Sequence, residues 1–211
     1  MTKAGPSEGS IYPVREDTRL LARFAEGTRG LTVLEIGTGN GRVAETAARA
    51  GARVVATDLH PGALAALRRR ALALALPVET VRTDLARGLR RFDRILANPP
   101  YLPTPPGARD PDPWANLALD GGPDGCEVLA RILALLPEHL AVGGRAYLVE
   151  SSRQPMARRL ELRSAWTARG GTVRRVAEEP MPGEVLEVTE WVPPTPNDPP
   201  AGRGRSGTPP D

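Results

Sequence analysis

The sequence predicts an α/β fold built on a doubly wound sheet of seven strands, mostly parallel, with an antiparallel strand at the C-terminal end. Three observations lead to this prediction. Short apolar runs rich in β-branched residues alternate with segments of helical periodicity. A glycine-rich turn follows the first apolar run, and acidic residues end the next two. Such alternation is typical of parallel strands joined by right-handed crossovers, so the carboxyl ends of these strands meet at one edge.

The composition is that of one folded domain. The chain has 211 residues, of which 40% are hydrophobic, so it can bury a sizeable core. Its formal charge of +3 is mild, although its pI near 9.6 leaves nucleic-acid partners open. The single cysteine, Cys126, excludes an internal disulfide, gives no metal cluster and is expected to be a small buried residue.

No apolar run approaches the ~18 residues of a membrane span, and the N-terminus lacks the apolar region of a secretory signal. We therefore expect no membrane contact and a cytoplasmic location. The expected domain spans residues 11–192. Residues 1–10 and the Pro/Gly-rich tail at 193–211 hold too few apolar residues to pack, so both are expected to be disordered.

Each element follows from its local pattern. The first helix is expected over residues 19–25, with Asp17 or Thr18 as its N-cap. Seven apolar runs are the expected strands: 31–36, 53–57, 77–83, 92–97, 145–150, 172–178 and 185–192. The helical patterns between them cover 43–50, 61–76, 127–140 and 154–169. A short connection separates the last two strands, so we expect them to be antiparallel neighbours.

Two irregular stretches interrupt this pattern. Residues 102–121 form an expected loop rich in Pro, Gly and Asp, and at about twenty residues it is longer than loops without a function usually are. Trp114 within it is either a core anchor or a substrate contact. The Gly143-Gly144 pair is expected to turn the chain into the fifth strand.

The segment Glu35-Ile36-Gly37-Thr38-Gly39-Asn40-Gly41 joins the first strand to the next helix. Its glycines allow a tight turn and the close approach of a ligand. A dinucleotide-binding turn needs a third glycine three residues after Gly39, where this chain has Arg42, so the pyrophosphate pattern is broken. The Glu35 carboxylate would repel a pyrophosphate and could pair with a positively charged ligand.

Asp58 and Asp84 end the next two strands and are expected at the same edge of the sheet. Asp58, with Leu59 beside it, is placed to accept hydrogen bonds from both hydroxyls of a ribose. Taken alone, Asp58 could instead cap the following helix. Asp84 and the backbone of Leu85 can contact the edge of an adenine. A ligand with an adenosine, no phosphate and a cationic centre fits this pattern, and S-adenosylmethionine has all three properties.

Asn98-Pro99-Pro100-Tyr101 directly follows the fourth strand. The prolines have fixed φ and push the residues before them into extended geometry, so the Asn98 side chain and the Pro99 carbonyl have few possible directions. Two fixed acceptors beside an aromatic ring suit a flat –NH₂ group. Taken alone, the tetrapeptide could equally be a proline-rich turn that leaves the sheet.

Together these motifs resemble class I S-adenosylmethionine-dependent methyltransferases, and more closely the release factor glutamine methyltransferases of the HemK/PrmC type. Three further stretches support the resemblance, which covers about residues 11–192. Residues 13–18 are similar to the family's Pro-x-x-Glu-Asp-Thr segment, residues 102–104 continue its Asn-Pro-Pro-Tyr motif, and residues 119–125 are similar to its Gly-Gly-x-x-Gly segment. The implied fold is the Rossmann-like methyltransferase fold.

The resemblance implies S-adenosylmethionine as the cofactor. The residues implied to bind it are Thr18, Glu35, Gly37, Thr38, Gly39, Asp58, Leu59, Asp84, Leu85 and Asn98. Tyr12 and the Thr18 hydroxyl are expected to cover its methionine end. Only about ten residues precede Tyr12, so the chain resembles the short, single-domain branch found typically in archaea and eukaryotes, which often works with a small zinc-binding activator subunit.

The implied reaction is methylation of a glutamine side-chain amide in the Gly-Gly-Gln loop of a peptide-chain release factor. Asn98 and the Pro99 carbonyl would each accept one N–H of the amide, Pro100 would keep the segment stiff, and Tyr101 would stack on the flat group. No lysine or histidine stands near the tetrapeptide in the sequence to serve as a general base. His60 and His139 are expected at the surface.

Two other functions stay open at this point. The same tetrapeptide serves enzymes that methylate adenine N6 or another nucleobase amino group in DNA or RNA. The absence of an added recognition domain and the scattered basic residues favour a protein substrate, with lysine as a weaker variation on glutamine. The third possibility, a non-catalytic scaffold that binds S-adenosylmethionine, is disfavoured by the intact Asn-Pro-Pro-Tyr motif.

Overall fold

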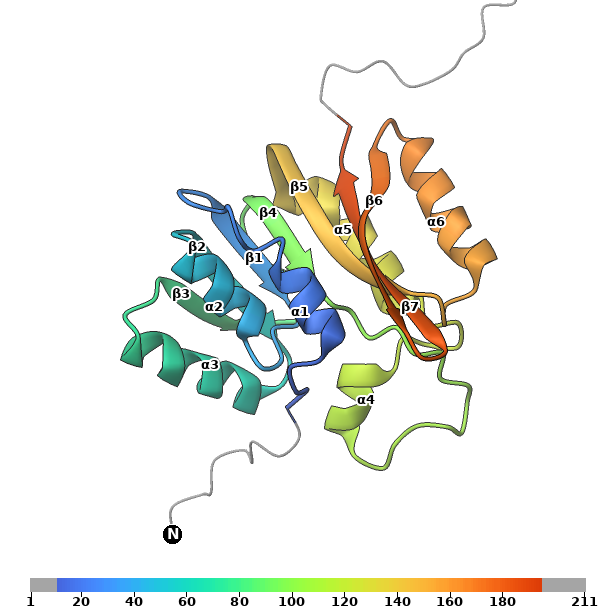
Figure 1. Ribbon diagram of the computed structural model, residues 1–211, viewed down its shortest axis with the longest axis horizontal. Helices are drawn as coiled ribbons and strands as arrows, with labels where there is room; N and C mark the ends of the chain where they lie inside the picture. Colours follow the sequence, from blue (N-terminus) through green and yellow to red (C-terminus); the bar gives the residue numbers. More distant parts are fainter. Residues whose placement is uncertain (1–10, 195–211) are drawn as a thin grey trace, which may run out of the picture.

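A seven-stranded sheet lies at the centre of the structure, and helices cover both of its faces (Figure 1). The computed structural model describes residues 11–194, so the disorder expected for residues 1–10 and 195–211 lies outside the described residues. The strands are β1 Thr32–Ile36, β2 Arg53–Asp58, β3 Val78–Arg82, β4 Phe92–Ala97, β5 Leu140–Ser151, β6 Thr172–Met181 and β7 Glu184–Val192. The helices are α1 Glu16–Ala22, α2 Arg42–Arg49, α3 Pro61–Ala73, α4 Pro113–Leu119, α5 Glu127–His139 and α6 Met156–Thr167.

The strands lie in the order β3-β2-β1-β4-β5-β7-β6. β7 is antiparallel to both of its neighbours, and all the other pairs are parallel, which confirms the expected mostly parallel sheet with one antiparallel C-terminal strand. The chain moves outward from β1 to β3 and then returns to place β4 on the other side of β1. This reversal creates a switch point at the carboxyl ends of β1 and β4, where open α/β sheets bind their ligands.

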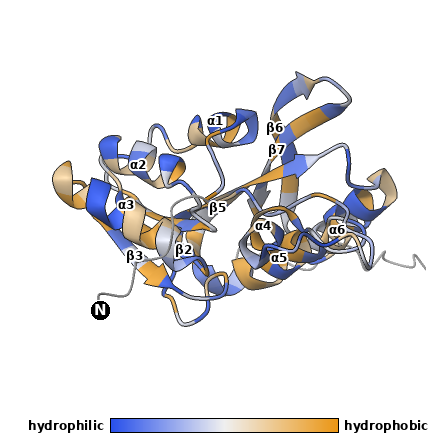
Figure 2. Ribbon diagram, turned by 90° about the horizontal axis from the view of Figure 1, so that it is seen from below, coloured by the Kyte–Doolittle hydropathy of each residue, from blue (hydrophilic) through white to orange (hydrophobic). Residues whose placement is uncertain are grey.

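The two faces of the sheet carry separate apolar clusters. Because neighbouring residues on a strand point to opposite faces, Val33 packs in one cluster and Leu34 in the other. Leu21 of α1 joins the Val33 cluster together with residues of α2, and Leu129 of α5 joins the Leu34 cluster together with Trp166 of α6. Figure 2 shows α1 and α2 on one side of the sheet and α5 and α6 on the other. No helix within residues 11–194 has the length and apolar character needed to cross a membrane.

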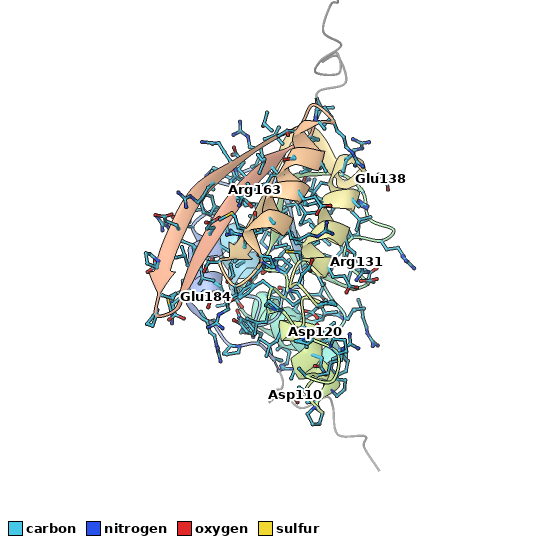
Figure 3. All side chains as sticks on the ribbon, turned by 90° about the vertical axis from the view of Figure 1, so that its right-hand side faces the viewer. Asp110, Asp120, Arg131, Glu138, Arg163 and Glu184 are labelled. Carbon is cyan, nitrogen blue, oxygen red and sulfur yellow. The ribbon has the colours of Figure 1, made fainter. Side chains whose placement is uncertain are left out.

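Buried charges join α6 to the sheet. Arg163 on α6 donates to Glu150 of β5 at 3.0 Å and to Glu187 of β7 at 3.2 Å (Figure 3). Arg159, only 2% exposed, also donates to Glu187, at 3.0 Å. Removing one member of a buried ion pair leaves an uncompensated charge, so these contacts strongly favour one placement of α6 on β5 and β7.

The expected loop at 102–121 contains a helix, α4, that the sequence analysis missed. Asp112 caps it by accepting a hydrogen bond from the Trp114 backbone N–H at 3.0 Å, and Pro113 occupies its first position. This Asp-Pro pair was the available signal for a helix start. The helix has only 7 residues and no buried side chain, which explains why it has no clear hydrophobic period.

Two other boundaries differ from expectation. α1 begins at Glu16, so Asp17 and Thr18 lie inside its first turn, and the N-cap residue, Arg15, makes no side-chain capping bond. The expected capping role of Asp17 or Thr18 is therefore wrong. β5 begins at Leu140 and contains both Gly143 and Gly144, because the strand continues through an irregularity in its pairing with β4 instead of turning there.

The glycine-rich segment before α5 packs directly on the backbone that follows β4. The Gly121 N–H donates to the Leu102 carbonyl at 3.0 Å, and a Cβ at Gly121 would lie 2.7 Å from the Pro100 carbonyl oxygen. Gly125 has φ of +73°, and a Cβ there would overlap the Tyr101 carbonyl oxygen. These glycines permit the backbone of residues 121–125 to pack against the backbone of residues 100–102, which limits the movement of the Asn-Pro-Pro-Tyr segment.

We predict that Gly125→Ala destabilises the protein more than Gly143→Ala does. Both glycines have positive φ, but a Cβ at Gly143 meets nothing within 4 Å. Gly143→Ala should therefore lower the free energy of unfolding by about 1–2 kcal/mol, because alanine is strained at positive φ. Gly125→Ala should lower it by a further amount of about 1–3 kcal/mol, because its Cβ also overlaps the Tyr101 carbonyl oxygen. Urea unfolding of both variants measures the difference, and equal losses would contradict the proposed contact.

Candidate functional site

A cleft with a volume of about 390 Å³ opens at the carboxyl edge of the sheet. Its walls come from the N-terminal arm (residues 11–15), α1, the glycine turn after β1 (residues 37–41), the ends of β2 and β3, the Asn-Pro-Pro-Tyr segment (residues 98–101), α4 and α5. All the residues that the sequence analysis assigned to the cofactor or to catalysis line it: Thr18, Glu35, Gly37, Thr38, Gly39, Asp58, Leu59, Asp84, Leu85, Asn98, Pro99, Pro100 and Tyr101. The structure thus brings together residues that lie more than 80 positions apart in the chain.

Glu35 holds the glycine turn in place from the end of β1. Its Oε2 accepts hydrogen bonds from the Thr38 hydroxyl at 2.6 Å and from the Ala44 backbone N–H, in the first turn of α2, at 2.9 Å. Its Oε1 has no partner among the described residues. The side chain is only 4% exposed, and this burial raises the pKa of Glu35 to about 8. One carboxyl oxygen therefore organises the turn, and the other is available to a ligand.

Asp58 joins the end of β2 to the glycine turn. Its Oδ2 accepts from the Gly39 N–H at 2.9 Å, and its Oδ1 accepts from the His60 N–H at 2.8 Å. The alternative role, capping α3, belongs to His60, whose Nδ1 accepts from the backbone N–H groups of Gly62 and Ala63 at 2.9 and 3.2 Å. Each Asp58 oxygen keeps a further lone pair, which is the arrangement that a pair of ribose hydroxyls would need.

His60 and His139 are not surface residues, so that expectation is wrong. They are 5% and 7% exposed. Because Nδ1 of His60 accepts two N–H groups, its proton lies on Nε2, and the ring packs at 4.4 Å from the Trp114 ring of α4. Trp114 is half-buried and lines the cleft, which makes it a wall of the site and not a core anchor.

Asp84, after β3, is paired with a residue that the sequence analysis did not identify. Arg131 on α5 donates to its Oδ2 at 2.6 Å, and both side chains line the cleft (Figure 3 labels Arg131). Leu85 has a left-handed φ of 56°, an unusual backbone state for a branched residue. Nothing in the sequence around residue 131 separates this arginine from the many others, because its partner lies 47 positions away.

Asn98 presents an acceptor to the cleft region. Its Oδ1 is buried and has no hydrogen-bond partner among residues 11–194. Buried polar atoms are nearly always paired, so an orphaned carbonyl oxygen at the carboxyl edge of the sheet indicates that a donor arrives with a ligand. The Asn-Pro-Pro-Tyr segment is therefore more than a turn that leaves β4.

Two tyrosines close the end of the cleft near Asn98. The hydroxyls of Tyr12 and Tyr101 both donate to Oδ2 of Asp17, at 2.7 and 3.0 Å. Burial, and then the negative charge of Asp17, raise the pKa of each tyrosine well above its usual range, so both hydroxyls keep their protons. No group of three His, Cys, Asp or Glu side chains within residues 11–194 is arranged to hold a metal ion.

We predict that Glu35→Gln changes how stability depends on pH. The native pKa of Glu35 is about 8, above its ordinary value of 4.5, so between these values the native chain holds a proton that the unfolded chain has lost. The unfolding free energy of the parent protein therefore falls as pH rises through this window. Glu35→Gln removes that dependence, so its melting temperature relative to the parent should rise between pH 5 and pH 8.5, as calorimetry can measure. Glu79→Gln is the control, because Glu79 is exposed and the melting temperature of this variant relative to the parent should not change with pH. The prediction would be refuted if the melting temperature of Glu35→Gln relative to the parent were equally independent of pH.

Comparison with known proteins adds an independent line of argument. Residues 33–106 match the protein-family model of a methyltransferase domain. A Methanocaldococcus jannaschii protein that carries the name protein N5-glutamine methyltransferase is 35% identical over 144 residues, which cover 67% of this chain and 73% of that protein. The chain spans only about half (51%) of the length of the release factor glutamine methyltransferases of Geobacter sulfurreducens and Deinococcus radiodurans, to which it is 35% and 40% identical.

Solved structures agree with the sequence relatives. A chain of the E. cuniculi Mtq2–Trm112 complex, described as responsible for methylation of the eRF1 termination factor, has a TM-score of 0.67 and 27% identity, over 87% of this chain and 99% of that one. The T. thermophilus 16S rRNA N2 G1207 methyltransferase, solved with AdoMet and guanosine, has a TM-score of 0.61 and 24% identity, over 86% of this chain and 44% of that one. The second likeness shows the shared fold alone.

Proposed function

This chain belongs to the HemK/PrmC family of release factor glutamine methyltransferases, and from that premise we propose its reaction. It methylates the side-chain amide nitrogen of a glutamine, in the Gly-Gly-Gln loop of a translation release factor, with S-adenosylmethionine as the methyl donor. The expected Rossmann-like class I methyltransferase fold is confirmed by the same comparisons. The observation that favours an –NH₂ group as the methyl acceptor is the buried Asn98 Oδ1, which has no hydrogen-bond partner among the described residues.

The residues present in the cleft fit S-adenosylmethionine. Glu35 and Asp58 place carboxyl oxygens around a glycine turn that lacks the dinucleotide-binding pattern, and these acceptors favour an adenosine ligand without a pyrophosphate. Asp58 would hold the ribose hydroxyls, Asp84 and Leu85 the adenine edge, and Thr18 with Tyr12 the methionine end. When bound, the cofactor supplies a methyl group made electrophilic by its sulfonium.

The Asn-Pro-Pro-Tyr segment acts on the other reactant. An amide nitrogen is a weak nucleophile because its lone pair is delocalised into the carbonyl. Asn98 Oδ1 and the Pro99 carbonyl accept the two N–H bonds of the substrate amide, which orients its nitrogen and adds electron density to it. The stiffness of the two prolines keeps both acceptors in place before the substrate arrives, so no reorganisation is needed at the moment of reaction.

The histidines do not act as a general base in this proposal. The Nδ1 of His60 is occupied by the α3 N-terminus, and its Nε2 is buried without a partner in the described residues. His139 lies at the far end of α5, near the Arg90 carbonyl. Catalysis therefore rests on positioning and on the electrostatics of fixed acceptors.

The proposal includes a partner and a location. The E. cuniculi relative was solved as a complex with Trm112, and its alignment with this protein covers 99% of the E. cuniculi chain. We propose a small zinc-binding activator subunit for this chain by analogy. A cytoplasmic location is part of the same proposal, because a translation factor is the substrate.

We predict that Asn98→Ala lowers kcat by about 10²–10³-fold, because one of the two amide acceptors is lost. Binding of S-adenosylmethionine should change by less than about threefold, since the other cofactor contacts stay in place. Calorimetry measures the binding, and methyl transfer to a release-factor domain measures kcat. Near-normal turnover of this variant on that substrate would exclude the proposed mechanism.

We also predict that a release-factor domain with an intact Gly-Gly-Gln loop is methylated and that the same domain with the glutamine changed to lysine is not. Adenine-containing DNA and RNA oligonucleotides should be methylated at least about 10²-fold more slowly. The assay uses labelled S-adenosylmethionine, with the protein alone and with a candidate activator subunit. Preferred methylation of the oligonucleotides would reverse the assignment in favour of a nucleobase methyltransferase.

A further inference from the structure

Asp17 is a buried carboxylate whose hydrogen bonds extend to two separate walls of the cleft. It lies in the first turn of α1 and is 1% exposed. Its Oδ2 accepts from the hydroxyls of Tyr12 at 2.7 Å and Tyr101 at 3.0 Å. Its Oδ1 accepts from the backbone N–H of Thr18 at 2.6 Å and from the Thr18 hydroxyl at 3.2 Å. Four donors surround this carboxylate, and no ion pair to it occurs among residues 11–194.

Tyr12 belongs to the cofactor half of the cleft. Its backbone carbonyl accepts from Asn40 Nδ2 at 3.0 Å, and its Cβ would lie 3.7 Å from a Cβ placed at Gly39. The N-terminal arm therefore lies against the glycine turn. In this position the arm covers one end of the cleft, and the hydrogen bond from Tyr12 to Asp17 helps to hold it there.

Tyr101 belongs to the acceptor half. It is the last residue of the Asn-Pro-Pro-Tyr segment and stands two residues after Pro99, whose carbonyl is proposed to receive the substrate amide. The hydroxyl bond to Asp17 fixes the far end of its ring, so Asp17 sets the direction of the aromatic wall beside the acceptor. The two tyrosines lie 89 positions apart in the chain and meet on a single oxygen atom.

A buried charge makes these two contacts depend on each other. An ionised carboxylate inside a protein is stable only when donors satisfy it, and a hydrogen bond to a charged group contributes about 1.5–3 kcal/mol. Because no ion pair to Asp17 occurs in the described part of the chain, loss of one tyrosine hydroxyl leaves its charge under-satisfied. Either hydroxyl bond also fixes the orientation of the Asp17 side chain, so the observed position of the arm and the observed orientation of the Tyr101 ring are favoured together.

We propose that Asp17 is a positioning residue that couples cofactor binding to acceptor binding, through Tyr12 on one side and Tyr101 on the other. Cofactor that contacts the closed arm stabilises the Tyr12–Asp17 bond and with it the Tyr101 orientation that the substrate needs. By linkage, bound substrate must tighten cofactor binding by the same factor. This inference rests on the proposed function, because the acceptor ligand in its test is a release factor.

The test compares the affinity of a release-factor Gly-Gly-Gln domain with and without S-adenosylhomocysteine, measured by calorimetry. The parent protein should bind the domain at least about fivefold more tightly when S-adenosylhomocysteine is present. In Asp17→Asn and in Tyr101→Phe this ratio should fall below about twofold. Tyr12→Phe keeps its ring and loses one bond to Asp17, so it tests the same coupling should Asp17→Asn fail to fold.

Asp93→Asn is the matched control. Asp93 accepts from the backbone N–H and the hydroxyl of Thr32 at 2.8 and 2.7 Å, the same pattern that Asp17 makes with Thr18, but it does not line the cleft. Loss of stability alone would affect both variants, whereas loss of coupling should affect only the Asp17 variant. The Asp93→Asn ratio should equal that of the parent.

The outcomes separate the two proposals. Failure of the parent protein to bind the release-factor domain under either condition would overturn the proposed substrate, and this inference with it. Binding with a ratio near one in the parent would overturn the coupling alone. A parent-like ratio in folded Asp17→Asn, or in Tyr12→Phe and Tyr101→Phe together, would show that Asp17 only supports α1.

Discussion

The cleft depends on one repeated interaction, a carboxyl group that accepts hydrogen bonds from a neighbouring segment of the chain. Glu35 holds the glycine turn against α2, Asp58 holds the same turn against β2, and Asp17 joins the N-terminal arm to Tyr101. Glu35 and Asp17 are buried, so each needs these donors to satisfy its oxygens, while Asp58 is half-buried at the edge of the cleft. The walls of the site are thus held by the same carboxyl oxygens that line the cleft and can accept hydrogen bonds from a ligand.

The two halves of the cleft have different physical characters. The cofactor half is made of strand ends and a turn with small residues, where backbone comes close to a ligand and carboxylates are near. The acceptor half is stiff, because two prolines restrict its backbone and Gly121 and Gly125 allow another segment to pack on its carbonyls. Stiff acceptors, together with an arm that covers one end of the cleft, suit a reaction whose rate depends mainly on how the reactants are positioned.

Much of this arrangement could be predicted. All seven strands, the parallel order through β5 and the antiparallel β7 follow from apolar runs and short connections, which are local signals. The residues expected in the site line one cleft because carboxyl ends of parallel strands share an edge. The sequence does not reveal α4, because a 7-residue helix without buried side chains has no clear periodicity of apolar residues. It also predicts a turn at Gly143-Gly144 where the structure has a strand irregularity, because glycine pairs are common in both.

By itself, the sequence determined the fold class, the edge of the sheet at which the site lies and the polar residues that meet there, since each depends on neighbours within a few positions. Only the tertiary structure decided how those residues share their hydrogen bonds. Asp17 was expected to cap a helix and instead binds two tyrosines, His60 was expected at the surface and is a buried cap, and Arg131 was not foreseen. Three of these contacts join residues that are 47 to 84 positions apart: Asp17 with Tyr101, Arg131 with Asp84, and His60 with the Trp114 ring. Local periodicity holds no information about such distant contacts.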